Sequence, residues 1–245
     1  MPNLPLSKTP LRNACLRLRN RLASGNEYTQ ILERYEINLV LDVGANVGQY
    51  ARNLIRNGYQ GQIVSFEPLP DAYHELTESR GGVPSWQTVP MALGNEDKIA
   101  TLNVAGNSMS SSLQGMLPAH LQAAPESAYI DQCDVTVKRL DSVFDRFYHS
   151  GQRCYMKLDV QGHEQQVIEG AAGCLDRILG NQMELSFQPL SDGQGDWQEV
   201  IATVESLGYQ LLSISPGFCD RRTGAMLQAD GIFIRKAAVE QCKKA

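Results

Sequence analysis

The chain has 245 residues, of which 42% are hydrophobic, and it carries 22 Lys and Arg against 27 Asp and Glu, for a net charge of −5. A chain of this length and composition can bury a full core, and no low-complexity linker divides it. The acidic balance argues against a protein that follows nucleic-acid phosphates, because such a protein normally presents a basic face. We therefore expect a small-molecule or glycan ligand and no nucleic acid.

The cysteines and the N-terminal region indicate a cytoplasmic protein. Six cysteines are scattered without a C-x-x-C pair or a histidine at zinc spacing, which is typical of reduced thiols. The N-terminal residues contain no apolar signal core, and no stretch approaches the roughly 18 apolar residues of a membrane span. We expect no structural zinc, no secretion and no membrane span.

Residues 1–38 are predicted to form a helical cap on the core. Apolar side chains recur there at helical spacing, with arginines between them, at Leu11, Cys15, Leu18 and Leu22. A solvated basic face is the simpler interpretation of this helix. The alternative is contact with an acidic membrane surface or with an anionic carrier of the substrate.

From residue 39 onward, predicted strands and helices alternate as a doubly wound α/β sheet requires. The predicted strands cover residues 39–43, 62–66, 86–91, 154–160, 182–187, 210–214 and 231–235. The last of these is expected to run antiparallel in a Rossmann-like sheet that is otherwise parallel. Helices are predicted over residues 48–57, 71–79 and 196–207. An insertion at about 95–140 interrupts the alternation, with strand-like patterning at 100–104 and 134–138.

The first predicted strand ends in a carboxylate and a glycine loop. Asp42 is followed by Gly44, Ala45, Asn46 and Gly48, so bare backbone leads into a helix. A nicotinamide site uses Gly-x-Gly-x-x-Gly around a diphosphate, whereas here the two glycines are four residues apart and Asp42 would repel a diphosphate. The carboxylate suits an ammonium group, such as the one at the methionine end of S-adenosylmethionine.

A second acid, Glu67, ends the next predicted strand and is followed by Pro68. Two strand-end acids about twenty residues apart indicate a ribose site. A carboxylate there would accept hydrogen bonds from both ribose hydroxyls. The plainer alternative for the glycine loop is a tight strand-to-helix turn without a ligand.

Several short blocks identify a family. In chain order they are Asp42 to Tyr50, Phe66-Glu67-Pro68, Ala92-Leu93-Gly94, Ser110-Ser111-Ser112-Leu113, and Met156 to Glu164 followed by Glu169-Gly170-Ala171. From about Leu39 to Ile234 the chain resembles the FkbM-type family of S-adenosylmethionine-dependent methyltransferases, and the Lys-x-Asp-x-x-Gly-x-Glu block is the most specific part. The resemblance implies a class I methyltransferase fold over residues 39–245, with S-adenosylmethionine as cofactor. Characterised members mostly methylate hydroxyl oxygens of natural products and sugars.

The resemblance also implies a set of cofactor-binding residues. They are Asp42, Gly44, Ala45, Asn46, Gly48, Tyr50, Glu67, Pro68, Ala92, Leu93, Ser111 and Asp159. The turn at Ala92 and Leu93 would face the adenine edge, with Met91 and Leu93 packing on the base. Ser110 to Ser112 either bind donor or acceptor through their hydroxyls or only satisfy the local backbone.

Lys157 is unusual because it lies inside a central parallel strand. Side-chain alternation places Tyr155, Lys157 and Asp159 on one face of that strand. A buried charge persists only when it is paired, so Lys157 needs an anion within reach. We expect Glu184, in the next strand, to be that anion, with Asp159 extending the pair. The alternative to a catalytic role is that this pair only fixes the floor of the site.

Methyl transfer to a hydroxyl requires donor and acceptor to be aligned and one proton to be taken up. His163, at the start of the helix after the fourth strand, is the leading candidate for the base, and Asp159 is the second; Lys157 completes the predicted catalytic set. Asp159 could instead bind a divalent ion. No further strand-end ligand follows Glu184, so a metal is possible but none is predicted.

The acceptor is expected to contact the insertion, the loop at residues 191–195 and the segment 216–229. In that segment Arg221 and Arg222 either bind an anionic acceptor or are simply solvated. The sequence thus favours O-methylation of a sugar, glycan or small natural-product metabolite. Two alternatives stay open: a non-catalytic S-adenosylmethionine-binding protein and a nicotinamide-dependent oxidoreductase, which the glycine spacing and the lack of a second domain disfavour.

Overall fold

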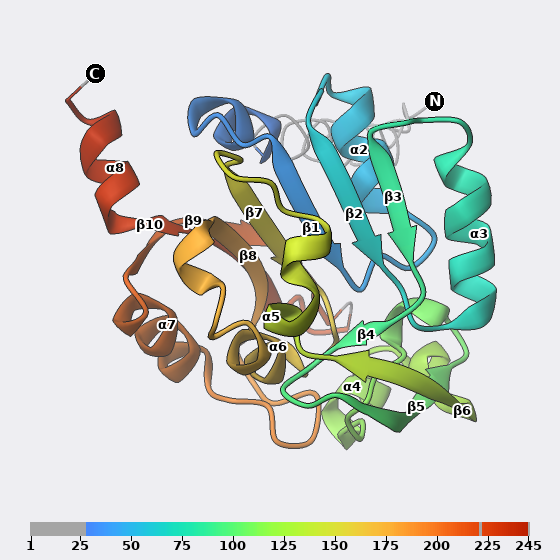
Figure 1. The fold of residues 1–245 in the computed structure, drawn as a ribbon. Helices are drawn as coiled ribbons and strands as arrows, with labels where there is room; N and C mark the ends of the chain where they lie inside the picture. The colour runs from blue at the N-terminus through green and yellow to red at the C-terminus, as the bar shows by residue number, and fades with distance from the viewer. Residues whose placement is uncertain (1–27, 221, 245) are drawn as a thin grey trace, which may run out of the picture.

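A twisted, mostly parallel sheet with helices against both faces forms the centre of the fold (Figure 1). The computed structural model describes residues 28–220 and 222–244. Among these residues, seven strands pair in the order β3-β2-β1-β7-β8-β10-β9. Their bounds are β1 Leu39–Val43, β2 Gln62–Phe66, β3 Trp86–Val89, β7 Cys154–Leu158, β8 Ile178–Ser186, β9 Tyr209–Pro216 and β10 Gln228–Arg235.

The strand directions confirm the predicted doubly wound α/β fold. Strand β1 pairs in parallel with both β2 and β7, and β8 continues in parallel beside β7. Strand β10 inserts between β8 and β9 and is antiparallel to both. The chain winds outward from β1 to β3 and then returns to β7 on the other side of β1. Ligands of such sheets bind at the carboxyl ends of the strands where this reversal occurs.

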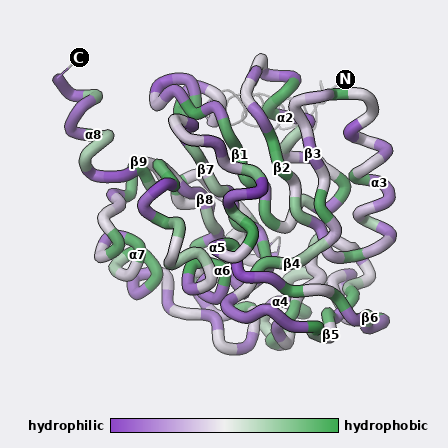
Figure 2. Tube along the Cα trace, in the orientation of Figure 1, coloured by the Kyte–Doolittle hydropathy of each residue, from purple (hydrophilic) through white to green (hydrophobic). Residues whose placement is uncertain are grey.

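Helices cover both faces of the sheet. Every residue of β1 is therefore buried, as expected of a central parallel strand. One face packs against α5, α6 and α7, and the other against α2, α3, α8 and the helical residues 28–34. The helix bounds are α2 Gln49–Arg56, α3 Pro70–Arg80, α4 Pro118–Ala123, α5 Leu140–Val143, α6 Glu164–Gly170, α7 Trp197–Ser206 and α8 Lys236–Cys242. Figure 2 shows hydrophobic residues along the central strands and largely hydrophilic residues along α3.

A small second sheet is formed mainly by the insertion. It has the order β4-β6-β5, with β4 Ala92–Leu93, β5 Lys98–Ala105 and β6 Tyr129–Lys138. Short 3-10 turns lie at Ser108–Ser110, Pro125–Ser127, Phe144–Arg146 and Leu175–Arg177. The prediction of one strand over residues 86–91 is therefore wrong at its end: β3 stops at Val89, because Pro90 has no N–H to donate to the ladder, and the chain passes into the second sheet.

The predicted N-terminal cap falls largely outside the described residues, which begin at Tyr28. Leu11, Cys15, Leu18 and Leu22 all precede that point. Within the described part, residues 28–34 are helical and Leu32 is buried in the core beside α2. The division at residue 38 stays a prediction.

Replacing Leu41 by Ala tests the central position of β1. Leu41 is fully buried, so Leu41→Ala should lower the free energy of unfolding by about 2–5 kcal/mol through lost transfer energy and a residual cavity. Leu212→Ala is the control, because Leu212 is 38% exposed and should change stability by no more than about 0.5 kcal/mol. Chemical denaturation of both variants measures the difference; equal losses would contradict this packing.

Candidate functional site

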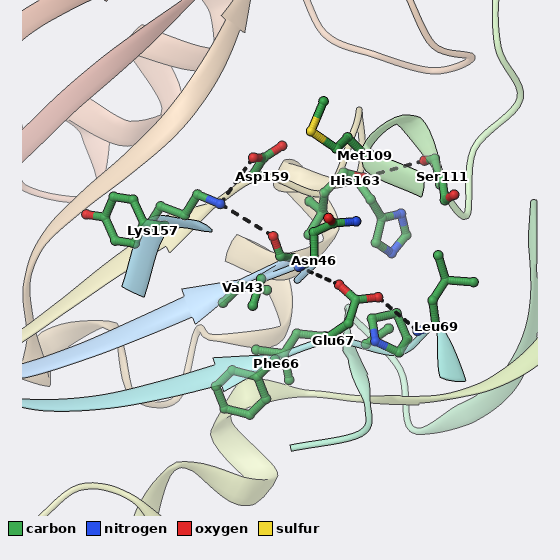
Figure 3. Close-up of a pocket in the computed structure, with 18 of the residues that line it drawn as sticks. Val43, Asn46, Phe66, Glu67, Leu69, Met109, Ser111, Lys157, Asp159 and His163 are labelled. Carbon is green, nitrogen blue, oxygen red and sulfur yellow. Dashed lines mark hydrogen bonds and ion pairs between the residues drawn. The ribbon is translucent and has the colours of Figure 1, made fainter. Parts of the chain in front are cut away.

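A cavity of about 680 Å³ opens at the carboxyl ends of β1, β2 and β7, where they meet the insertion (Figure 3). The topology gathers there most of the residues predicted to bind cofactor or to act in catalysis. Those that line it are Gly44, Ala45, Asn46, Tyr50, Glu67, Pro68, Ala92, Leu93, Ser111, Lys157, Asp159 and His163. Residues that lie more than one hundred positions apart in the sequence therefore share one site.

The glycine loop after β1 comes into close contact with the end of β7. Gly44 has φ +75°, and a Cβ atom there would lie 1.9 Å from the carbonyl oxygen of Asp159. Only glycine permits this approach without strain. Gly48 serves a different purpose from the predicted one, because it does not line the cavity: a Cβ atom at Gly48 would lie 2.9 Å from Leu76 and Trp86. It lets α2 start close against α3 and β3.

Glu67 is buried at the end of β2 and is held by the backbone on both sides. Its Oε2 accepts a hydrogen bond from the N–H of Asn46 (2.8 Å), and its Oε1 accepts one from the N–H of Leu69 (2.9 Å). Burial raises the pKa of Glu67 to about 7, although both hydrogen bonds act in the opposite direction. Each carboxylate oxygen keeps a second lone pair. The carboxylate therefore fits a ligand that presents two neighbouring hydroxyls, such as a ribose.

Apolar side chains line the cavity beside Glu67. They come from β2, from the segment around β4 and from the insertion, and include Phe66, Leu69, Met91, Leu93, Leu102 and Leu113. A slot of this kind suits the faces of a planar base next to the ribose site. Leu102 and Leu113 were not predicted, because their position depends on how the insertion folds back over the sheet.

Asp42 does not reach the cavity, contrary to the prediction that it meets the ammonium group of the donor. Its carboxylate is fully buried, and its Oδ2 accepts a hydrogen bond from the Ser65 hydroxyl (3.0 Å). The Ser65 hydroxyl in turn accepts one from the indole N–H of Trp86 (2.9 Å). Burial raises the pKa of Asp42, while Lys157 opposes the shift. Asp42 therefore supports the site from beneath.

Lys157 pairs with Asp159, as Figure 3 shows, and also with Asp42, so the predicted pair with Glu184 is wrong. Its Nζ lies 3.1 Å from Oδ2 of Asp159 and 3.5 Å from Oδ1 of Asp42. Burial opposes the charge on Lys157, but the two carboxylates outweigh it and raise its pKa. The register explains the error, because Gln182 is the residue of β8 beside Lys157. Glu184 instead accepts hydrogen bonds from the amides of Gln161 and Gln228.

Asp159 and His163 line the same cavity in different settings. Asp159 is 39% exposed and accepts hydrogen bonds from Lys157 and from the Gln161 amide. His163 precedes α6, and its Nδ1 lies 2.9 Å from Nε2 of Gln114. Burial lowers the pKa of His163 to about 4, and Lys98 adds to the shift. Because an amide nitrogen donates, Nδ1 is the acceptor and the ring proton lies on Nε2.

Four polar residues at one end of the cavity were not predicted as site residues: Tyr28, Gln182, Glu184 and Asp230. The Tyr28 hydroxyl donates to Asp230 (3.3 Å), and the Tyr50 hydroxyl donates to Gln182 (3.3 Å). Asp230 lies opposite Glu184 in the ladder between β10 and β8. The predicted last strand began at Gly231, so it left out the acid that the strand carries into the site.

The predicted arginine contacts receive no support from the described residues. Arg222 binds Asp220 through two guanidinium nitrogens, at 3.1 and 3.0 Å, and does not line the cavity. Arg221 lies outside the described residues. In the described part of the chain, no three His, Cys, Asp or Glu side chains are placed to hold a metal ion. Within the same residues, no helix has the length and apolar character that crossing a membrane requires.

The family model described as "Methyltransferase FkbM domain" matches residues 42–211, which include the glycine loop, Glu67 and the Lys157 to Glu164 block. The chain belongs to this family. The FkbM domain is that of an S-adenosylmethionine-dependent methyltransferase, and the cavity residues described above fit the donor: Glu67 for a diol, and the apolar slot for a base.

Similar proteins include the hexuronic acid methyltransferase AglP of Haloferax volcanii, which is 26% identical over 149 residues, 60% of this chain and 55% of AglP. The present chain thus matches little more than half the length of AglP. Methyltransferase 1 of Beauveria bassiana is 25% identical over 186 residues, 69% of this chain and 71% of that protein. Among solved structures, the magnesium protoporphyrin IX methyltransferase of Synechocystis PCC 6803 with bound S-adenosylmethionine aligns with a TM-score of 0.48 and 8% identity, over 96% of this chain and 87% of that one.

Removing the charge of Lys157 tests its pairing in the FkbM domain. Lys157→Met keeps most of the side-chain volume but leaves Asp42 buried without a cation, so unfolding should become easier by about 3–5 kcal/mol at pH 7.5. The loss should shrink toward pH 5, because burial raises the pKa of Asp42 and protonation then removes the unpaired charge. Lys243→Met is the control, since Lys243 and Glu240 form an exposed pair. A loss that does not change with pH would contradict this assignment.

Proposed function

We propose that this FkbM domain transfers a methyl group from S-adenosylmethionine to a hydroxyl of a sugar, glycan or small natural-product metabolite. The observation that carries the proposal is the arrangement of one cavity: a buried carboxylate with two free acceptor positions, Glu67, at one side, and Asp159 with its bound Lys157 at another. The first suits the ribose of the donor, and the second suits the hydroxyl of an acceptor.

The chain supplies binding and alignment on the donor side. Glu67 accepts the ribose hydroxyls, and the loop from Gly44 to Asn46 lines the cavity beside the donor. Met91 and Leu93 pack against the base. The N–H groups of Asn46 and Leu69 keep Glu67 fixed before the donor binds, so little ordering is required on binding.

S-adenosylmethionine supplies a methyl group bound to a positively charged sulfur. As the acceptor oxygen bonds to the methyl carbon, the carbon–sulfur bond breaks and the sulfur leaves as the neutral thioether of S-adenosylhomocysteine. The proton of the acceptor hydroxyl must then go to a residue of the chain. We assign it to Asp159, which is partly exposed to the cavity and whose two oxygens are already held by Lys157 and Gln161. His163 is the weaker candidate, because its Nδ1 accepts from the Gln114 amide and its Nε2 carries the ring proton, which leaves no free lone pair on the ring.

The polar end of the cavity supports a hydroxylated acceptor. Tyr28, Tyr50, Gln182 and Asp230 place hydroxyl, amide and carboxylate groups there, and these groups pair well with the hydroxyls of a sugar. AglP is a hexuronic acid methyltransferase, which supports an acceptor of the same chemical class.

Calorimetric titration of the purified protein with S-adenosylmethionine and S-adenosylhomocysteine, with NAD as the control, is the first test. We expect micromolar binding of the adenosyl ligands and none of NAD. Transfer of labelled methyl is then screened over methyl glycosides, glucuronic acid and, for contrast, an RNA oligonucleotide. Folded protein that binds neither adenosyl ligand would refute the proposal, while binding without transfer to any acceptor would favour a non-catalytic binding protein.

The role of Glu67 predicts a pH dependence of donor binding. The ionised carboxylate accepts both ribose hydroxyls, and the pKa of Glu67 is raised to about 7, so the affinity for S-adenosylhomocysteine should be full at pH 8 and fall below pH 7. The fall should approach about tenfold per pH unit, as expected when one proton must be released on binding.

Glu67→Gln isolates this effect. The variant should bind S-adenosylhomocysteine more weakly by on the order of 1.5–3 kcal/mol at pH 8, the scale for a charge-assisted hydrogen-bonding group, and the pH dependence should disappear. Glu78→Gln, at an exposed position of α3, should behave like the wild type. If Glu67→Gln keeps the wild-type pH profile, another group titrates and Glu67 does not hold the ribose.

The assignment of the base predicts unequal effects of two substitutions. Asp159→Asn should lower the methyl-transfer rate by on the order of a hundredfold or more, the usual contribution of a general base, with the affinity for S-adenosylhomocysteine retained. His163→Ala should lower it by less than about tenfold, because the ring contributes position but does not take up the proton. Single-turnover assays with an acceptor from the screen measure both rates. The reverse order of effects would return the base to His163.

A further inference from the structure

We propose that Gln161 is a positioning residue of this site: it holds the Asp159 carboxylate toward the transferred methyl group and separates it from Glu184. This inference rests on the proposed function, because it concerns how Asp159 is presented. Gln161 itself does not line the cavity. It acts through Asp159 and is not a catalytic residue.

The amide of Gln161 bridges two carboxylates. Its Nε2 donates to Oδ1 of Asp159 at 2.9 Å and to Oε2 of Glu184 at 3.1 Å, which uses both of its hydrogens. Lys157 binds the other oxygen of Asp159 at 3.1 Å. Each oxygen of Asp159 therefore has its own donor, and rotation of the carboxylate would break at least one of these bonds.

The backbone of Gln161 is fixed independently of its side chain. Its φ of +54° lies in the left-handed region, which is uncommon for a residue with a Cβ atom. Its carbonyl oxygen accepts hydrogen bonds from the hydroxyls of Ser112 (2.8 Å) and Ser191 (3.1 Å). These serines come from the insertion and from the loop after β8. Two segments on the far side of the turn thus hold the residue whose amide orients Asp159.

The charges around Asp159 explain why a neutral donor is needed between the two acids. The ionisable groups that face Asp159 come from five elements: Asp42 of β1, Lys157 of β7, Glu164 of α6, Glu184 of β8 and Asp230 of β10. Lys157 is the one cation in this set. Burial and the neighbouring acids raise the pKa of Glu184, so the amide of Gln161 is a neutral donor that Asp159 and Glu184 share. Without that amide, Oδ1 of Asp159 would lose its donor, and the carboxylate would be free to turn about its remaining bond to Lys157.

The test compares two ligands that need no acceptor. Sinefungin carries an amine in place of the methylated sulfonium of the donor, whereas S-adenosylhomocysteine carries neither the methyl group nor the charge. A correctly placed Asp159 binds the amine, so the ratio of the two affinities at pH 7.5, measured by calorimetry, reports the position of the carboxylate. We expect the wild type to prefer sinefungin.

Gln161→Asn keeps an amide and tolerates a positive φ, but it is one carbon too short to bridge the acids. It should reduce the sinefungin preference by on the order of tenfold, the scale for losing a charge-assisted contact, with the affinity for S-adenosylhomocysteine within about twofold of the wild type. Gln161→Gly removes the amide, accepts the same backbone conformation and should reduce the sinefungin preference as Gln161→Asn does. Gln165→Asn is the matched control, because Gln165 is exposed on α6 and its amide donates to Glu169.

Each outcome of this comparison either supports or overturns the role of Gln161. An unchanged preference in either Gln161 variant overturns the inference, and so does an equal loss for both ligands, which would mark a merely structural role. Asp159→Asn must abolish the preference; if it does not, or if the wild type shows none, Asp159 does not face the methyl group and the inference fails. Failure of the wild type to bind S-adenosylhomocysteine would instead overturn the proposed function itself.

Discussion

The pairing of one buried lysine with two carboxylates holds the centre of this structure together. Lys157 lies in β7, while its partners are Asp42 in β1 and Asp159 just beyond β7. A cation at this depth persists only with such partners, so the ends of the two central strands cannot move apart without leaving a charge unpaired. Asp42 is tied in turn to Ser65 of β2, and Ser65 to Trp86 of β3. One chain of polar contacts therefore spans four neighbouring strands beneath the cavity.

The donor side and the reaction side of the cavity are linked through backbone. Gly44 contacts the carbonyl group of Asp159 so closely that no side chain fits between them, and the N–H of Asp159 donates to the carbonyl of Val43. The loop that carries Asn46 toward Glu67 is thus fixed relative to the carboxylate assigned to the acceptor. Under the proposed function, this backbone contact between the ends of β1 and β7 would set the donor relative to the acceptor.

The sequence predicted best what local pattern determines. β1 and β2 begin and end where predicted, because each is a short apolar run bounded by a break, and Glu67 follows directly from the end of β2. The partner of Lys157 was wrong because it depends on the register between β7 and β8, which no local pattern encodes. Asp230 was missed and Asp42 was misplaced for a related reason: whether a strand-end acid faces a cavity or the sheet interior is decided by the neighbouring strands.

The Lys157 to Glu164 block, the most specific of the family, forms the turn between β7 and α6. Glu164 accepts hydrogen bonds from the N–H groups of Val160 and Gly162, both at 3.2 Å, which closes the loop between β7 and α6. Gly162 has φ +96°, and a Cβ atom there would lie 2.6 Å from Ser191. Lysine, acid, glycine and acid at this spacing thus build the frame that presents Asp159. Under the proposed function, the acceptor would be selected elsewhere, by the insertion and by β10, so members of one family could share this frame and methylate different molecules.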